Sequence, residues 1–331
     1  MNRRNLHLGA LTLAASTLLL AGCAPATPAA DSSPRASATA AFPVSIDNCG
    51  TTVTVEKAPE RIVTIKSSTT ELLLALGLGD NIVGSAFLDG PLPAELARTG
   101  APLNVISDFL PGQEAVLGLT PDFISGGWES NFSADGVGER DRLADLGIGS
   151  YVSPAACKAP EHMPDPLTFE SVFDEITEAG ALFGAADAAA ELVAEQKADL
   201  AALEPASGTT TALWFSSGTD TPYVGAGIGS PAMIMGAAGL TNIFGDVHDT
   251  WTSVGWESVV EANPEVVVLV DATWNTAASK IATLESSPAT QGLDAVKNKR
   301  YVILPFAATE AGIRTVEAAG SAIDQLAAFD K

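Results

Sequence analysis

The sequence predicts an α/β protein of two similar lobes, each a mainly parallel sheet flanked by helices, joined by a helical connector. Three observations support this fold class. Apolar strands alternate with helical segments in both halves of the chain, a short pattern occurs twice, and a helix-rich segment lies between its two occurrences. Such alternation favours a parallel sheet with helices on its faces. The 331 residues also exceed the roughly 100–200 residues of an average domain.

The first 23 residues predict an export signal. Arg3 and Arg4 precede an uncharged apolar run at 8–20, which is followed by Leu-Ala-Gly-Cys ending at Cys23. This run is shorter than the roughly 20 apolar residues of a membrane span. The ending resembles the bacterial lipoprotein signal, in which Cys23 becomes the lipidated first residue of an extracytoplasmic protein anchored to the cell membrane; a secretion signal with a chance Cys is the alternative. The Ala/Pro/Ser/Thr-rich residues 24–42 predict a flexible tether.

Residues 43–166 are expected to form the first lobe. Residues 61–65 (Arg-Ile-Val-Thr-Ile) predict a short buried strand, and the Ser and Thr residues at 67–70 open a segment with helical periodicity. Hydroxyl groups at that position can accept a hydrogen bond from a free amide of the first helical turn. Further on, residues 114–120 predict a short helix that stops before Pro121, and a strand follows.

The second lobe, expected at residues 205–331, repeats this pattern. The matching positions share a constant offset and a side-chain type, and they are Glu114, Val116, Leu117, Pro121 and Asp122 in the first half and Glu257, Val259, Val260, Pro264 and Glu265 in the second. Gly77-Leu78 followed by 81–84 similarly resembles Gly239-Leu240 followed by 242–245. Chance similarity between ordinary α/β segments is the alternative.

Residues 167–204 are expected to be the connector. The stretch is rich in Ala, Glu, Leu and Lys, with interior glycines at Gly180 and Gly184, so we expect two helices or one broken helix. A helical connector holds two lobes at a more constant separation than a Gly/Ser linker would.

Charge and histidine content exclude several classes of function. A formal net charge of −23 repels phosphate backbones, so we expect no nucleic-acid partner. The chain has three His, and His7 lies in the predicted signal. No metal site built on three histidines is therefore expected in the mature protein.

No sequence motif of an enzyme stands out. The chain has no His-Glu-x-x-His, Gly-x-Ser-x-Gly, Gly-Lys phosphate loop or Cys-x-x-Cys, and we expect no catalytic residues. Two alternatives stay open: a metal-ion-binding importer component using His248 beside Asp246 and Asp249, and an extracellular hydrolase with paired acidic residues in a cleft.

Cys49 and Cys157 remain as an even pair once Cys23 is lipidated. Because the chain is expected to function in an oxidising compartment, we expect a disulfide between them. Two buried free thiols are the alternative.

Together these segments resemble the substrate-binding proteins of ABC importers for iron-siderophores and cobalamin. The resemblance runs from Val44 to the C-terminus and rests on RIVTI with SSTTELLLALGLGDNIVG, EAVLGLTPDFIS, the connector and WESVVEANPEVVVLV. IKSSTTELLLALGLGD, GWESNFSADG and SSGTDTPYVGAGIGSP are most similar to a subgroup proposed to bind a deazaflavin coenzyme precursor.

The resemblance implies a monomer with a ligand cleft between two lobes. Its function would be to capture a bulky small molecule (an iron-siderophore, a corrinoid or a deazaflavin coenzyme precursor) and deliver it to a membrane permease driven by a cytoplasmic ATPase. The ligand would be transported cargo, so no cofactor is implied.

Ligands of open α/β sheets bind beyond the carboxyl ends of the strands, so residues at those ends are the candidates for ligand binding. Tryptophan can stack on a flat ring while its N–H binds a polar edge, although core packing is the alternative for each one. Lys66 and Arg314, with helix amides, could hold a carboxylate or phosphate, although either could lie on the surface. The candidates are Lys66, Ser67, Ser68, Thr69, Trp128, Glu129, Trp214, Ser216, Ser217, Tyr223, Trp251, Trp256, Trp274 and Arg314.

Glu71 and Glu257 are expected to dock the permease. In the family, one surface Glu on each lobe contacts Arg residues of the permease, and these two occupy the matching places in SSTTELL and GWESVV. A first-turn Glu stabilised by the helix dipole is the alternative at both positions.

Overall fold

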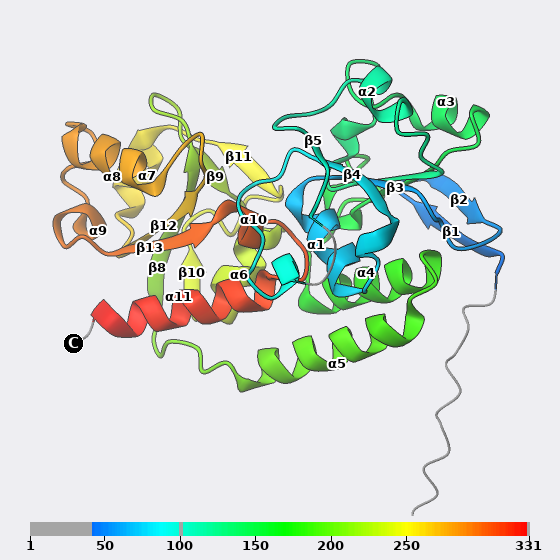
Figure 1. The fold of residues 1–331 in the computed structure, drawn as a ribbon. Coiled ribbons are helices and arrows are strands. Elements are labelled where there is room, and N and C mark those ends of the chain that lie inside the picture. Colours follow the sequence, from blue (N-terminus) through cyan, green and yellow to red (C-terminus); the bar gives the residue numbers. More distant parts are fainter. Residues whose placement is uncertain (1–41, 99–101, 330–331) are drawn as a thin grey trace, which may run out of the picture. The chain divides into compact units, whose positions relative to one another are not determined.

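A computed structural model describes residues 42–98 and 102–329 (Figure 1). The predicted signal, Cys23 and all of the predicted tether except its last residue lie outside the described residues. The described residues all belong to one compact unit. Within its described part, no helix combines the length and apolar character needed to cross a membrane.

The first lobe is built on five parallel strands in the order β5-β4-β3-β6-β7. Every residue of β3 and β6 is buried, as expected for parallel strands covered on both faces. The strands are β3 (Ile62–Ile65), β4 (Ile82–Ala86), β5 (Val105–Ser107), β6 (Phe123–Gly126) and β7 (Gly149–Val152). An antiparallel hairpin of β1 (Val44–Asn48) and β2 (Thr51–Val55) precedes them, and the helices are α1 (Ser67–Ala75), α2 (Gln113–Leu117) and α3 (Arg140–Asp145).

The second lobe contains a mixed sheet in which β8 is central. Its strand β8 pairs in parallel with β12 and β10 and antiparallel with β9, while β13 extends the parallel part and β11 the antiparallel part. The strands are β8 (Thr210–Ser217), β9 (Tyr223–Gly225), β10 (Leu240–Asn242), β11 (Trp251–Ser253), β12 (Val266–Asp271) and β13 (Tyr301–Pro305). The helices are α6 (Ser230–Ala237), α7 (Trp256–Ala262), α8 (Ala277–Ser286), α9 (Asp294–Lys297), α10 (Phe306–Thr309) and α11 (Thr315–Phe329).

The two lobes share a topology, and the repeated sequence pattern marks it. The order β4-β3-β6-β7 corresponds to β10-β8-β12-β13. Before β6, Asp122 accepts hydrogen bonds from the amides of Glu60 and Arg61 at 2.9 Å, and before β12, Glu265 accepts one from the amide of Thr211 at 3.0 Å. Each acid thus supplies an acceptor at the entry of the neighbouring central strand. The prediction of two similar lobes is confirmed.

The connector consists of two helices, α4 (Phe169–Leu182) and α5 (Ala186–Ala202). Val172, Phe173 and Ile176 of α4 are buried in the core of the first lobe, and α5 runs back along α4 toward the second lobe (Figure 1). Gly184, between the helices, has φ 75°, a conformation that glycine adopts readily.

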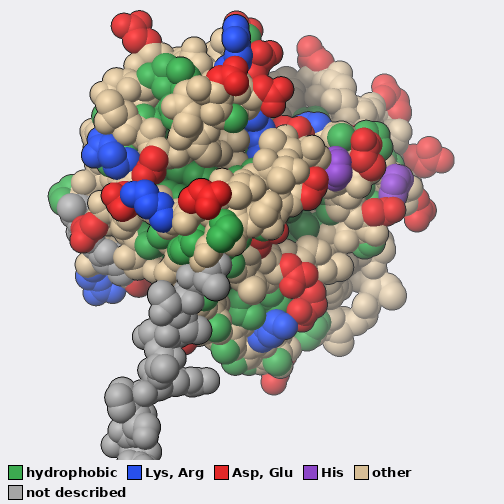
Figure 2. Space-filling model, turned by 90° about the vertical axis from the view of Figure 1, so that its right-hand side faces the viewer, with side chains coloured by type: hydrophobic (Ala, Val, Ile, Leu, Met, Phe, Trp, Pro, Cys, Tyr) green, Lys and Arg blue, Asp and Glu red, His purple; other side chains and the backbone are tan. Residues whose placement is uncertain are grey.

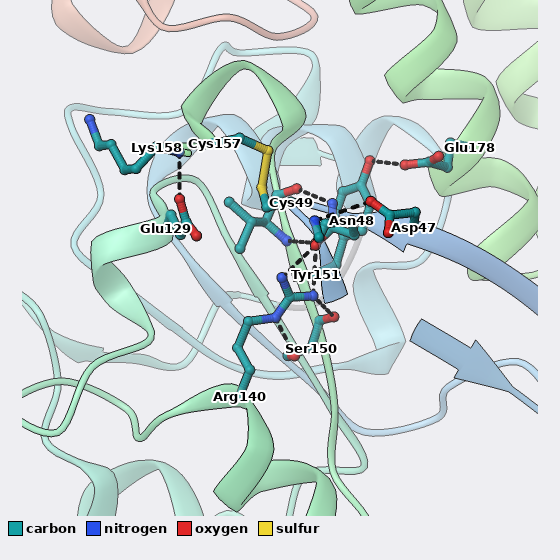
Figure 3. The surroundings of a disulfide bond; sticks show 12 residues. Asp47, Asn48, Cys49, Glu129, Arg140, Ser150, Tyr151, Cys157, Lys158 and Glu178 are labelled. Atoms are coloured by element: carbon teal, nitrogen blue, oxygen red, sulfur yellow. Dashed lines mark hydrogen bonds between the residues drawn. A yellow bond between two sulfur atoms is a disulfide. The ribbon is translucent and has the colours of Figure 1, made fainter. Parts of the chain in front are cut away.

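A disulfide joins Cys49 in the β1–β2 turn to Cys157 after β7 (Figure 3). The same turn is held by Arg140, which donates hydrogen bonds to the backbone oxygen of Asn48 at 2.7 Å and to its side-chain oxygen at 2.9 Å. The disulfide expected from the sequence is therefore present, and it fixes the segment that follows β7.

Glu71 of α1 contacts Arg314 of the second lobe. Only 1% of the Glu71 side chain is exposed, and its carboxylate lies 3.6 Å from Nη1 of Arg314. Ile313 packs against the core of the first lobe, so this segment joins the lobes. The expectation that Glu71 is a surface docking residue is wrong, because its side chain is buried. Arg314 also pairs with Glu317 at 3.0 Å. It does not line the ligand cavity described below, so the expectation that Arg314 contacts the ligand is wrong as well.

We predict that Glu71→Gln stabilises the protein at neutral pH. Burial raises the pKa of Glu71 from 4.5 to about 7, although Arg314 opposes the shift. The folded state therefore favours the neutral carboxyl, and the parent loses stability as pH rises from about 4.5 to about 7. Denaturant unfolding should show the variant more stable by roughly 1–3 kcal/mol at pH 7.5 and by little at pH 4. Glu261→Gln, at an exposed position of α7, is the control; a pH-independent difference for Glu71→Gln would contradict the prediction.

Candidate ligand-binding site

A cavity of about 470 Å³ is lined by residues of both lobes. Its walls come from segments that directly follow strands: Phe87 follows β4, Trp128 follows β6, Ser153 follows β7 and Phe306 follows β13. This is where parallel α/β sheets bind ligands. Six of the candidate ligand-binding residues predicted from the sequence line the cavity, namely Trp128, Ser216, Ser217, Tyr223, Trp251 and Trp274.

Aromatic rings form much of the cavity wall. In the second lobe Tyr223 stacks on Trp251, with ring centroids 5.8 Å apart and an interplanar angle of 14°. In the first lobe Phe87 meets Trp128 edge-on at 5.4 Å. Tyr223 is 40% exposed, so its ring remains available to a ligand. A cavity of this size and lining suits a flat organic molecule.

Lys66 lies behind this aromatic wall. It is 0% exposed and forms an ion pair with Asp89. Its ammonium lies 3.7 Å from the centroid of the Trp128 ring, 4.3 Å from that of Phe87 and 4.8 Å from that of Phe306. Cation–π attraction therefore helps to position three wall residues, although Lys66 itself does not line the cavity. The expectation that Lys66 contacts the ligand is wrong, because Asp89 and the rings enclose it.

The backbone at Lys66 is strained. Its φ of 84° and ψ of 153° lie in a region that almost only glycine adopts. The packing is also tight, since a Cβ at Gly127 would lie 2.8 Å from the Cβ of Lys66. Such strain persists only where the surroundings fix the residue, and the buried ion pair provides that constraint.

Ser67, Ser68 and Thr69 are buried and do not line the cavity. Asp89 accepts a hydrogen bond from the amide of Ser67 at 3.1 Å, and its own amide donates to Oγ of Ser67 at 2.8 Å. Thr69 donates to the backbone oxygen of Ile65 at 3.0 Å. The prediction that the start of α1 receives an anionic ligand is wrong, because the carboxylate of Asp89 already occupies it.

Three further candidates lie outside the cavity lining. Trp214 is 0% exposed and packs edge-on behind Trp251 at 6.4 Å. Trp256 is buried and donates a hydrogen bond to the backbone oxygen of Thr219 at 2.7 Å. Glu129 accepts a hydrogen bond from the amide of Lys158 at 2.5 Å (Figure 3). The prediction that these three residues line the ligand cavity is wrong, because each packs or hydrogen-bonds within the protein outside the lining.

Glu310 links the two lobes at the cavity wall. Its carboxylate accepts a hydrogen bond from Nε1 of Trp128 at 2.6 Å. Burial raises the pKa of Glu310, and the charge of Lys66 opposes this shift. The wall of the first lobe is thus connected to the segment that follows α10.

Sequence reasoning missed several lining residues, namely Phe87, Phe109, Lys158, Lys280, Phe306 and Glu310. Phe87 and Phe306 directly follow strands, so the strand-end criterion applied to phenylalanine as well as tryptophan would have found them. Neither Glu310 nor Lys280 carries such a signal, because the folding of distant segments brings them to the cavity.

Acidic side chains are spread over the surface in Figure 2, in keeping with the negative net charge. In the part of the chain that the structure describes, no three His, Cys, Asp or Glu side chains are grouped so as to hold a metal ion. His248 is exposed and lies 3.6 Å from Asp165.

We predict that Asp89→Asn is strongly destabilising. The substitution leaves the Lys66 ammonium buried without its counter-ion, and breaking a buried pair from one side costs about 3–5 kcal/mol. Urea unfolding at pH 7 measures the loss. The double variant Lys66→Met/Asp89→Leu should be less destabilised, since it removes both charges. Ordinary surface substitutions change the free energy of unfolding by less than about 0.5 kcal/mol. An Asp89→Asn variant whose free energy of unfolding is that close to the parent's would show that the ion pair is unimportant.

Comparison with known proteins agrees with this geometry. Residues 62–308 match the periplasmic binding protein family. The chain is 28% identical over 325 residues to the Bacillus subtilis protein named uncharacterized ABC transporter substrate-binding lipoprotein YvrC, covering 96% of this chain and 95% of that one. It is 27% identical over 215 residues to the vitamin B12-binding protein of Photorhabdus laumondii, covering 64% of this chain and 71% of that one.

Solved structures show the same fold. A protein described as an ABC-type Fe3+-hydroxamate transport system from Saccharomonospora viridis aligns with a TM-score of 0.73 and 27% identity, covering 86% of this chain and 99% of that one. A periplasmic binding protein from Veillonella parvula aligns with a TM-score of 0.74 and 24% identity, covering 86% and 97%. The two-lobed fold, the cavity at the strand ends and the family match over most of the chain agree, and the chain belongs to the periplasmic binding protein family.

Proposed function

We propose that this ABC-importer substrate-binding protein captures a flat aromatic, acidic small molecule outside the cytoplasm and delivers it unchanged to a permease. The aromatic-lined cavity shared by the two lobes carries the proposal. Its lining favours a planar ring system over a bare ion. The family assignment favours transport over the hydrolase and metal-ion alternatives.

Among iron-siderophores, corrinoids and deazaflavin coenzyme precursors, we favour a deazaflavin coenzyme precursor as the ligand. It combines a flat ring system with polar groups. It is also smaller than a corrinoid, so it suits a cavity of about 470 Å³ better. The relative named as a vitamin B12-binding protein keeps a corrinoid as the second candidate.

Transport requires that ligand affinity differ between two arrangements of the lobes. A ligand that contacts Trp128 on one lobe and Trp251 on the other stabilises the arrangement in which both rings reach it. The hydrogen bond between Trp128 and Glu310 would then help to define that arrangement. Capture and release need no bond chemistry.

Lipid attachment at Cys23 would keep the protein next to its permease. Two observations support this attachment. The predicted signal has a lipoprotein-type ending, and the Bacillus subtilis relative, 95% of whose length aligns with this chain, is named a lipoprotein. Monomeric capture on a short tether fits this arrangement.

The ligand prediction is tested with protein purified from its source organism. Native mass spectrometry should detect one bound small molecule, and denaturation should release it as a flat aromatic acid. Trp251→Ala should reduce its affinity about tenfold or more, because it removes a central aromatic contact. Leu146→Ala, at an exposed residue outside the cavity lining, is the control. Release of a chemically converted product would contradict the transport function.

Docking to the permease requires one exposed Glu on each lobe, and we propose Glu114 with Glu257. Both are exposed and lie in the first turn of α2 and α7. They occupy equivalent places of the internal repeat, because α2 leads into β6 as α7 leads into β12. Two separated carboxylates give a two-point contact that sets orientation. Glu114 thus replaces the buried Glu71 in this role.

We predict that Glu114→Lys/Glu257→Lys abolishes uptake of the co-purified ligand by cells while its affinity for the isolated protein stays unchanged. Each single variant should reduce uptake in part, since one charge contact remains. The control is Glu261→Lys, which also changes an exposed Glu of α7. Normal uptake by the double variant, or a loss of ligand affinity, would contradict the docking role.

A further inference from the structure

Two lysines are buried among the residues that the structure describes, and they differ in their partners. Lys66 is paired with Asp89. Lys280, in the first turn of α8, is 3% exposed and donates a hydrogen bond from Nζ to the backbone oxygen of Val270. No carboxylate of the described residues lies within 4.0 Å of its ammonium.

Lys280 lines the ligand cavity together with polar groups at the ends of β8 and β12. Ser217 ends β8, and Asn275 follows β12. An ammonium has three N–H donors, and the backbone oxygen of Val270 accepts from one of them. Its other donors, together with the Ser217 hydroxyl and the Asn275 amide, add polar groups to a cavity that is largely lined by aromatic rings.

The charge of Lys280 is poorly compensated by the protein. Burial lowers the pKa of Lys280 from 10.5 to about 8, and the nearby Asp271 only partly opposes the shift. An ammonium taken from water without a counter-ion is unfavourable. An anionic group of a ligand at this position would supply the missing counter-ion and gain a charge-assisted hydrogen bond.

We infer that Lys280 binds the anionic group of the transported ligand, a carboxylate or a phosphate, on the wall of the second lobe. This inference rests on the proposed function, and it gives Lys280 the anion-binding role predicted from the sequence for Lys66 and Arg314. The flat part of the ligand would contact the rings while its acidic group contacts Lys280, so Lys280 determines the preference for an anion.

The other charged residues of the lining do not replace it. Lys158 is exposed, and its ammonium remains in contact with water. Glu310 accepts a hydrogen bond from Trp128 and carries the wrong sign. Lys280 is therefore the lysine of the lining that combines burial with the lack of a carboxylate partner.

The test compares 2-naphthoate with 2-naphthamide, which share a flat ring and a similar shape and differ in charge. Isothermal titration calorimetry at pH 6.5 should show that the parent binds 2-naphthoate about 10- to 100-fold more tightly, the worth of a hydrogen bond to a charged group. Lys280→Met should remove the preference, and Lys280→Arg should keep most of it. Lys297→Met, at an exposed lysine of α9 outside the cavity lining, is the matched control and should keep the preference. Thermal unfolding shows that each variant is folded.

Each outcome decides a separate point. Equal binding of the two compounds by the parent, or a preference that survives in Lys280→Met, overturns the role of Lys280 and leaves the proposed transport function standing. A parent that binds neither compound contradicts the inferred ligand class, whereas native mass spectrometry tests cargo capture independently. If Lys280→Met is unfolded, loss of the preference in a folded Lys280→Arg variant also counts against the inference, because the charge is retained.

Discussion

The ion pair between Lys66 and Asp89 is the constraint on which the ligand site depends. It is buried, it holds Lys66 in a backbone conformation unusual for a lysine, and it places an ammonium behind the rings of Trp128, Phe87 and Phe306. These rings come from segments after three different strands. A single buried charge thus positions aromatic residues of both lobes, which apolar packing alone would orient less specifically.

The internal repeat explains why the cavity lies where it does. Both lobes use the same order of parallel strands, and the carboxyl ends of those strands meet at the cavity. Trp128 with Glu310 and Glu71 with Arg314 then connect the lobes through polar contacts. Because those contacts include the buried carboxyl group of Glu71 and the partly buried one of Glu310, the relation between the lobes depends on charge and solvent access as well as on shape.

The sequence predicted the two lobes, the repeat, the helical connector, the disulfide and part of the aromatic lining, since each depends on local pattern or on position after a strand. It did not predict where along a strand the core ends and the cavity begins: Trp214 and Ser216 are two residues apart on β8 and share a face of the sheet, yet Trp214 is buried in the core and Ser216 lines the cavity. It also placed Lys66 and Glu71 in contact with ligand or partner, because their counter-charges Asp89 and Arg314 are distant in sequence. Lys280 lies within a helix where a lysine is ordinarily solvent-exposed.

In the proposed mode of binding, the cavity holds a flat anion between aromatic walls of the two lobes, and Lys280 of the second lobe neutralises its charge. A crystal structure of the protein with its co-purified ligand is the decisive experiment. We expect the ring system to contact Trp128 and Trp251, and an anionic oxygen to lie about 2.7–3.2 Å from Nζ of Lys280. A ligand bound outside this cavity, or one whose acidic group points to solvent while Lys280 contacts only Val270, would contradict it.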